Sequence, residues 1–331
     1  MSEKALSIFE KIQQLDRRYI YVILAIAIIL PLIFPYNSKT YTTRPTENIY
    51  RMIDSFAPKF PEGATEAEKD AIALEHDRAV LLVFLHDAST MSELFPMELA
   101  VIRHCFERRV KFFTFTIYPT SAPIIDMAIN EVKKSYPNKT SGVDYINFGY
   151  KVSSLFLPII LGMGEDISEA IDIDAEGRKI ASLPAMTNIT NYNQMNLVID
   201  FSGSTAGGTW ITYARPRFGV NVAVGVTAVM AADEYPQLQT GQLIGMLAGM
   251  KGAAEYEKLV DVFAAQQREF SSSVLRNEAE PTITDERVAY AFRQARIGMN
   301  AQSIAHILII VFILIGNTGF FVTKYLQKKD K

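Results

Sequence analysis

The sequence contains few of the residues that usually mark disulfides, metal sites and nucleic-acid-binding surfaces. Cys105 is the one cysteine in 331 residues, so no disulfide can form within the chain. The four histidines are spread along the chain without the short spacings of a zinc site. The formal net charge of −3 also lacks the basic excess of a nucleic-acid-binding surface. We therefore expect no nucleic-acid partner and no zinc centre.

Common catalytic motifs are missing as well. Segment 202–208, SGSTAGG, lacks the Gly-Lys-Ser/Thr ending of a phosphate-binding loop and the spacing of a dinucleotide fingerprint. Its serines also lack the G-x-S-x-G setting of a nucleophile elbow. A pair of Ser202 with His86, supported by Asp87 or Asp200, is conceivable, but no spacing in the sequence enforces it. We predict no catalytic residues and favour a protein that is not an enzyme.

Two long apolar runs lie near the two ends of the chain. Tyr19 to Pro35 carries no charge, and no small-x-small cleavage pattern follows it. Ile304 to Val322 precedes a lysine-rich tail. Each run is long enough to cross a bilayer, so we expect two membrane-spanning helices. In the second run, Gly316 and Asn317 are small and polar residues of the kind that face another helix.

The basic residues beside these runs predict an orientation. Lysine and arginine are somewhat more frequent on the outer flanks, at the two chain ends, than on the inner flanks. The positive-inside rule then gives a two-pass protein of the cell membrane, with both termini in the cytoplasm and residues 37–303 outside it. The expected partners are membrane lipid and either further copies of this chain or other membrane subunits.

Apolar runs of strand length alternate with helical segments between the two spans. The predicted strands cover residues 79–85, 110–118, 144–150, 197–201 and 220–229. Uniformly apolar strands separated by helices are typical of a parallel sheet covered on both faces, so we predict a Rossmann-like or flavodoxin-like α/β domain. The chain then divides into a cytoplasmic segment (1–18), a first span (19–35), a helical lead-in (36–78), the α/β domain (79–270), a linker with a membrane-proximal helix (271–303), a second span (304–322) and a basic cytoplasmic tail (323–331).

A glycine-rich stretch follows the last predicted strand. In Thr240 to Leu259, Gly241, Gly245 and Gly249 recur every four residues, which places them on one face if the stretch is a helix with Thr240 as its N-cap. Each interior glycine costs a helix about 1 kcal/mol, so this face should gain from close packing. We expect it to pack on the sheet, with a subunit interface as the alternative. The N-terminal amides of such a helix could also hold an anion.

Polar residues follow several of the predicted strands. In an open parallel sheet, ligands bind beyond the carboxyl ends of the strands. Together with the N-cap of the glycine-rich stretch, the candidate ligand-binding residues are Asp87, Asp200, Ser202, Ser204, Thr227 and Thr240.

The pattern Asp200-x-Ser202-x-Ser204 at the end of a strand resembles the metal-adhesion motif of von Willebrand factor A domains. The resemblance implies a divalent cation, Mg²⁺ or Ca²⁺, held by the aspartate and the two serine hydroxyls. In that family the motif ends the first strand, whereas three predicted strands precede it here. Thr227 and Asp233 are possible later ligands, but the sequence does not place them. A hydrogen-bonded turn that caps the next helix explains the same residues.

These features predict a membrane-anchored extracytoplasmic α/β scaffold, receptor or accessory subunit of an envelope complex. One alternative is an enzyme or sensor that binds a ligand or divalent cation at the strand ends. Another alternative is an accessory domain of an ABC-type transporter.

Overall fold

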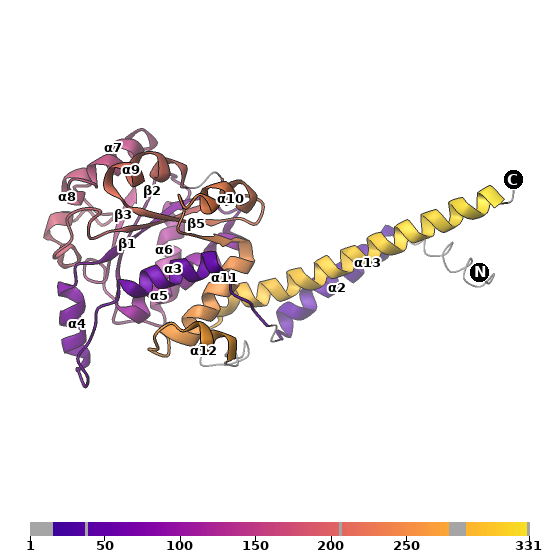
Figure 1. Cartoon of the computed structure of the whole chain (residues 1–331), viewed down its shortest axis with the longest axis horizontal. Helices are drawn as coiled ribbons and strands as arrows, with labels where there is room; N and C mark the ends of the chain where they lie inside the picture. The colour runs from indigo at the N-terminus through magenta and orange to yellow at the C-terminus, as the bar shows by residue number, and fades with distance from the viewer. Residues whose placement is uncertain (1–15, 37–38, 205–206, 278–288, 330–331) are drawn as a thin grey trace. The chain divides into compact units, whose positions relative to one another are not determined.

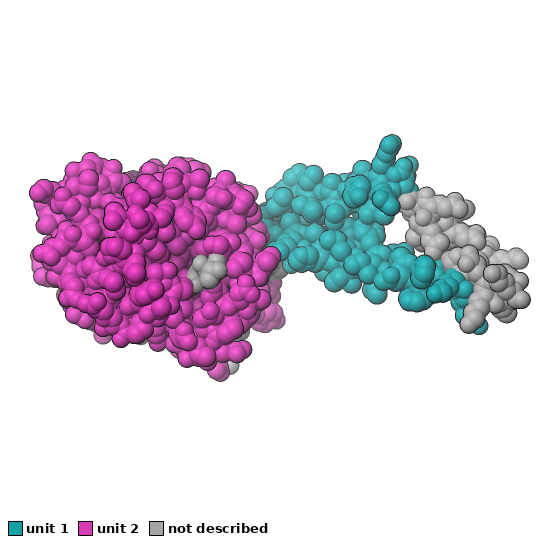
Figure 2. Space-filling view, turned by 90° about the horizontal axis from the view of Figure 1, so that it is seen from above, with its two compact units in different colours: residues 1–38, 297–331 teal, residues 39–296 magenta. Residues whose placement is uncertain are grey.

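The computed structural model describes residues 16–36, 39–204, 207–277 and 289–329. The chain divides into two compact units, residues 1–38 with 297–331 and residues 39–296, which Figure 2 colours separately. Most of the predicted cytoplasmic segment, part of the predicted linker and the last residues of the predicted tail lie outside the described residues. Each unit is described by itself below.

The larger unit is built on a six-stranded parallel sheet (Figure 1). Its strands lie in the order β3-β2-β1-β4-β5-β6, and every neighbouring pair is parallel. The predicted α/β fold with a parallel sheet is therefore confirmed, and its strand order is consistent with a Rossmann-like fold. The strands are β1 (Ala79–Leu85), β2 (Lys111–Thr116), β3 (Tyr145–Tyr150), β4 (Leu197–Ser202), β5 (Asn221–Val226) and β6 (Gly245–Ala248).

Helices cover both faces of this sheet (Figure 1). Helices α3, α5 and α11 lie on one face, and α7, α9 and α10 lie on the other. The central strands β1 and β4 are buried along their whole length, which explains their uniformly apolar sequences. The helices of this unit are α3 (Arg44–Ser55), α4 (Glu66–Glu75), α5 (Met91–Arg108), α6 (Ala122–Lys133), α7 (Phe156–Gly162), α8 (Ile167–Ala170), α9 (Arg215–Phe218), α10 (Ala231–Gln239), α11 (Gly249–Leu259) and α12 (Ser272–Asn277), with π-helical turns at Trp210–Ala214 and Val260–Ala264 and 3₁₀ turns at Ser153–Leu155, Ile180–Ser182, Pro184–Met186 and Tyr290–Arg293.

The stretch Thr240 to Leu259 is not one helix, so that prediction is wrong. Thr240 follows the last residue of α10 and caps its C-terminus rather than an N-terminus. Gly241 adopts a φ of 73° in the turn that follows. Gly245 then begins strand β6, and Gly249 begins α11 with a φ of 56°. The three glycines therefore lie in a turn, a strand and a helix start, and they share no helix face.

Close packing around β6 explains why the glycine at its start is needed. A Cβ at Gly245 would lie 2.4 Å from the carbonyl oxygen of Pro45 and 2.5 Å from Ile49 Cγ1, so only glycine lets the strand approach α3 this closely. Helix α3 packs against β6, and Asn48 Nδ2 donates a hydrogen bond to the carbonyl of Ile244, just before the strand, at 3.0 Å. Gly245, in a strand, and Gly249, at a helix start, serve close packing within the unit, whereas a Cβ at Gly241 would meet no atom within 4 Å.

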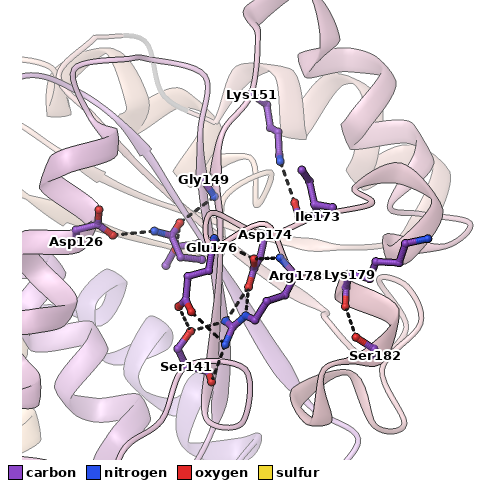
Figure 3. A network of polar contacts seen from close by, with 12 residues as sticks. Asp126, Ser141, Gly149, Lys151, Ile173, Asp174, Glu176, Arg178, Lys179 and Ser182 are labelled. Carbon is purple, nitrogen blue, oxygen red and sulfur yellow. Dashed lines mark hydrogen bonds and ion pairs between the residues drawn. The ribbon is translucent and has the colours of Figure 1, made fainter.

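A tight turn covers the other edge of the sheet, beside β3 (Figure 3). The buried Asp174 accepts hydrogen bonds from the backbone N–H groups of Glu176 (2.9 Å) and Arg178 (2.8 Å) and from Arg178 Nε (2.8 Å). The N–H of Ala175 donates to the carbonyl of Asn147 on β3 at 2.8 Å. This turn occupies backbone groups that an edge strand otherwise exposes.

The smaller unit contains α2 (Arg17–Ile33) and most of α13 (Gln294–Lys329). Among the described residues, one helical stretch, Tyr290–Val322, is long and apolar enough to cross a membrane. Helix α2 has 17 residues and is therefore about 26 Å long, somewhat less than the roughly 30 Å of a hydrocarbon core. Within this unit the side chain of Asn300 donates a hydrogen bond to the carbonyl of Tyr36.

Candidate functional site

The ends of β1 and β4 meet where the strand order of the sheet reverses. Leu85 and Ser202 are neighbours in the ladder, and Ser202 Oγ lies 3.4 Å from the carbonyl oxygen of Leu85. Beyond the strands, Gly203 packs against Thr90, since a Cβ at Gly203 would lie 2.9 Å from Thr90 Cγ2. Ligands of open α/β sheets bind at this reversal point. The loops that carry Thr90 and Gly203 therefore form the candidate site.

Asp87 forms a preorganised turn at this site. Its Oδ1 accepts hydrogen bonds from the backbone N–H of Ser89 at 2.8 Å and from Ser89 Oγ at 2.6 Å. These bonds from Ser89 hold the pKa of the Asp87 carboxyl below its usual range. Asp87 is exposed, so the site presents a fixed negative charge to solvent.

Asp200 lies deeper, on β4 itself. Its side chain is buried, and its Oδ2 accepts a hydrogen bond from the N–H of Gly207 at 3.1 Å. Its Oδ1 has no hydrogen-bond partner among the described residues. Burial raises the pKa of Asp200 to about 7, with the N–H of Gly207 opposing the rise and the charge of Glu234 adding to it. The carboxyl is therefore about half protonated at neutral pH.

The two serines of the predicted cation motif take part in the turn after β4. Ser202 Oγ accepts a hydrogen bond from the N–H of Ser204 at 3.2 Å and lies 3.4 Å from Ser204 Oγ. Within the described ranges, no group of three or more His, Cys, Asp and Glu side chains could hold a metal ion. A site of one aspartate and two serines is of a different kind. The contacts of Ser202 and Ser204 are those of a hydrogen-bonded turn, and the cation site stays a prediction.

The two predicted threonines lie at opposite ends of α10. Thr227 follows β5 at the candidate site, where its Oγ1 accepts a hydrogen bond from the N–H of Met230 at 3.4 Å. Thr240 donates through Oγ1 to the carbonyl of Pro236 at 2.9 Å, at the C-terminal end of the helix. Because α10 returns the chain to the start of β6, Thr240 lies at the amino-terminal ends of the strands, opposite the candidate site. Its predicted place at the ligand edge is therefore wrong.

His86 follows β1 but does not meet Ser202. Its Nε2 is hydrogen-bonded to Glu98 Oε1 of α5, and both side chains are fully buried. Burial opposes the charged form of His86, but the hydrogen bond and the charge of Glu98 outweigh it and raise the pKa of His86. Sequence analysis missed Glu98, although an acidic residue within the apolar stretch 94–102 of the helix was an available signal.

A second contact missed from the sequence joins three elements beside the site. Glu93 of α5 accepts a hydrogen bond through Oε2 from the N–H of Ala228, after β5, at 2.8 Å. A Cβ at Gly249 would lie 2.8 Å from the same oxygen. The beginnings of α5 and α11 therefore meet at the end of β5, where Gly249 is needed for both its φ and its close approach.

Helix α11 also binds the segment through which the chain enters the larger unit. Glu255 Oε2 accepts hydrogen bonds from the backbone N–H of Thr43 at 2.8 Å and from Thr43 Oγ1 at 2.7 Å. Lys258 Nζ donates to the carbonyl of Thr40 at 2.6 Å. Glu255 and Lys258 are buried, so these contacts are part of the interior of the unit.

The same helix binds the segment through which the chain leaves the unit. Glu257 accepts hydrogen bonds from the N–H groups of Ala295 (2.9 Å) and Arg296 (3.1 Å) in the first turn of α13. An acidic group at a helix N-terminus satisfies free amides and complements the helix dipole. Burial raises the pKa of Glu257 to about 8, and the charge of Arg296 and these two N–H groups oppose that rise.

Asp261 completes this attachment. It lies in the π-helical turn after α11 and accepts a hydrogen bond from Arg103 Nη1 of α5 at 2.6 Å and another from Arg296 Nη2. All three side chains are buried. We call Glu255, Glu257, Lys258 and Asp261 the α11 clamp. Sequence analysis did not find it, because its partners are far apart in the chain.

Comparisons of the chain with protein-family models, with curated proteins and with solved structures gave no match. Its function is therefore inferred from its own residues and contacts.

Proposed function

We propose that this chain is a two-pass membrane protein whose α/β unit lies outside the cytoplasm and serves as a non-enzymatic scaffold or receptor subunit of an envelope complex. The observation that carries this proposal is the α11 clamp. One helix binds both the segment that follows the first apolar run and the segment that precedes the second.

The clamp favours a role in which the connection to the membrane matters. A domain that only needs to be near a membrane can be connected to its spans by flexible linkers. Here the entry and exit segments are bound by buried ionisable side chains, and burying polar or charged groups carries a desolvation cost. A scaffold or a receptor explains that cost, because assembly or signalling needs a defined connection between the unit and its spans.

The ends of α2 support its assignment as the first span. Tyr19 and Tyr21 lie in its first turns and Tyr36 lies just beyond its end, and all three are exposed. Tyrosines at both ends of an apolar helix are typical of the two interfaces of a bilayer. With 17 residues, α2 is at the lower limit of about 17–25 residues for a span.

The candidate site supports binding rather than catalysis. His86 is hydrogen-bonded to Glu98, and Ser202 Oγ accepts a hydrogen bond from the N–H of Ser204 in its own turn. The two side chains therefore do not form a nucleophile–base pair. The exposed Asp87 is instead a group that could accept hydrogen bonds from a ligand.

Cysteine labelling in intact cells tests the topology. Cys105 is buried, and burial raises the pKa of its thiol well above the usual range, so the wild-type chain should not react. Lys39→Cys and Tyr325→Cys each add an exposed thiol, one beyond each span. We expect a membrane-impermeant maleimide to label Lys39→Cys in intact cells and Tyr325→Cys only after permeabilisation. The reverse pattern, or equal labelling of both, would reject the proposed orientation.

A further inference from the structure

We propose that a second copy of this chain binds to the face of α13 that carries Ile313, Asn317 and Phe320, with the two Asn317 carboxamides hydrogen-bonded to each other inside the membrane. This inference rests on the proposed function, because it requires α13 to be a membrane span. It names the partner at that span.

Asn317 is a polar residue within the stretch that is long and apolar enough to cross a membrane. Its side chain is exposed, and its carboxamide makes no hydrogen bond to any other described residue. Hydrocarbon offers no hydrogen bonds, so a carboxamide facing lipid alone is unfavourable. Asparagine is too short to reach the headgroups from this depth, since five residues separate it from the end of the apolar run at Val322. Another polar group in the membrane is therefore expected to meet it.

The smaller unit shields the opposite face of α13. The more covered positions recur every three or four residues along the helix, at Ala301, Ile304, Leu308, Phe312, Ile315 and Gly319. Asn317 follows Leu308 by nine residues, or two and a half helical turns, which places it on the other side of the helix. The face with Asn317 is thus the one left open to an additional helix.

The residues around Asn317 permit close approach. Gly316 lies about 100° around the helix from Asn317, at the margin of this face, and a Cβ there would meet no atom within 4 Å. A small residue beside the contact lets two backbones come together in a membrane. Ile313 and Phe320 precede and follow Asn317 on the same face and are 54% and 56% exposed. They provide apolar contact on both sides of the polar group.

The chemistry of the amide favours a second copy over a different protein. A carboxamide carries both a donor and an acceptor, so two Asn317 side chains satisfy each other across a two-fold axis. A different subunit would need its own polar group at the same depth. Interhelical hydrogen bonds of this type change association by about 3- to 30-fold.

Disulfide crosslinking of the full chain in native membranes tests the contact. Cys105 is buried and unreactive, so single-cysteine probes can be read directly. We expect Ile313→Cys, on the proposed face, to form a homodimer on mild oxidation, and Leu308→Cys, on the shielded face, not to do so. Adding Asn317→Leu to the Ile313→Cys chain should reduce the dimer about 3- to 30-fold at low expression. Thr318→Val, a neighbouring polar-to-apolar change on a different side of the helix, is the matched control and should have no effect.

Three outcomes would overturn the inference. They are the absence of an Ile313→Cys dimer, a crosslink from this position to another protein only, and a dimer that Asn317→Leu leaves unchanged. Alkaline carbonate extraction of the same membranes distinguishes the loss of this contact from a failure of the proposed membrane span. An extracted chain would reject the membrane span itself, whereas a retained chain without the dimer would reject this contact alone.

Discussion

Asp200 illustrates, at the residue scale, how depth changes the chemistry of a motif. Its ladder neighbours are Val83 on β1 and Val224 on β5, so its carboxyl begins inside the sheet rather than at its mouth. Apolar surroundings favour the neutral carboxyl, whereas a hard cation needs the charged form. The D-x-S-x-S spacing carries no information about this depth, so the burial of Asp200 was not predicted from the motif.

Asp200→Asn tests the raised pKa directly. Asp200 has a pKa of about 7 in the folded chain against an ordinary value of 3.8, so the folded state keeps a proton that the unfolded state releases. Its contribution to stability is present below about pH 4 and is lost as the pH rises through 7. One pKa unit corresponds to about 1.4 kcal/mol, so the expected loss is a few kcal/mol.

The measurement is urea unfolding of detergent-solubilised full chain at pH 5 and pH 8, followed by the fluorescence of Trp210, the one tryptophan. The wild type should lose more stability between these pH values than Asp200→Asn, because asparagine does not titrate. Equal losses in the two proteins would show that Asp200 is ionised in the folded state.

Sequence analysis could identify the residues at the strand ends but not their partners. Asp87 and Ser202 follow apolar strands, and the topology of a parallel sheet brings such ends together. Arg103 and Asp261 are 158 positions apart, and no local spacing connects them. The pairing of Glu98 with His86 depends on how α5 packs against the sheet, which local sequence does not specify.

At the scale of elements, the central strands were predictable and β6 was not. Strands β1 and β4 are buried throughout, so they read as continuous apolar runs. Strand β6 has four residues, too few for a period of two to stand out against the four-residue repeat of the glycines. Its pairing with β5 and its contact with α3 join residues far apart in the sequence, and these contacts make residues 245–248 a strand despite their helical pattern.

The α11 clamp leads to a prediction at this scale. Asp261→Asn removes the charge that two buried arginines share and leaves them the longer contacts with Glu107 (3.9 Å) and Glu257 (3.6 Å). Breaking a buried ion pair costs about 3–5 kcal/mol. We therefore expect a large fall in unfolding free energy, together with faster hydrogen exchange at the amides of Ala295 and Arg296.

The control is Glu131→Gln, which removes an exposed pair with Lys134 and should cost about 0–1 kcal/mol. If Asp261→Asn is as mild as this control and leaves exchange at Ala295 unchanged, the clamp does not hold the start of α13.

At the scale of the whole molecule, the two apolar runs and the α11 clamp both concern how the α/β unit is connected to a membrane. The chain carries a stretch fit to cross a membrane and an α/β unit whose entry and exit are bound to one helix. The stretch Tyr290–Val322 was visible in the sequence because a candidate span needs only length and apolarity. The clamp was not visible, because it depends on charged side chains that the fold buries.

The most direct test of the scaffold or receptor role is the mass of the assembly. The full chain would be extracted from its own membranes into polymer nanodiscs, without detergent, and measured by mass photometry. The account predicts particles that contain at least two copies of the chain or the chain with other membrane proteins. Particles that contain a single chain at every expression level, from membranes in which the chain also never crosslinks, would contradict it.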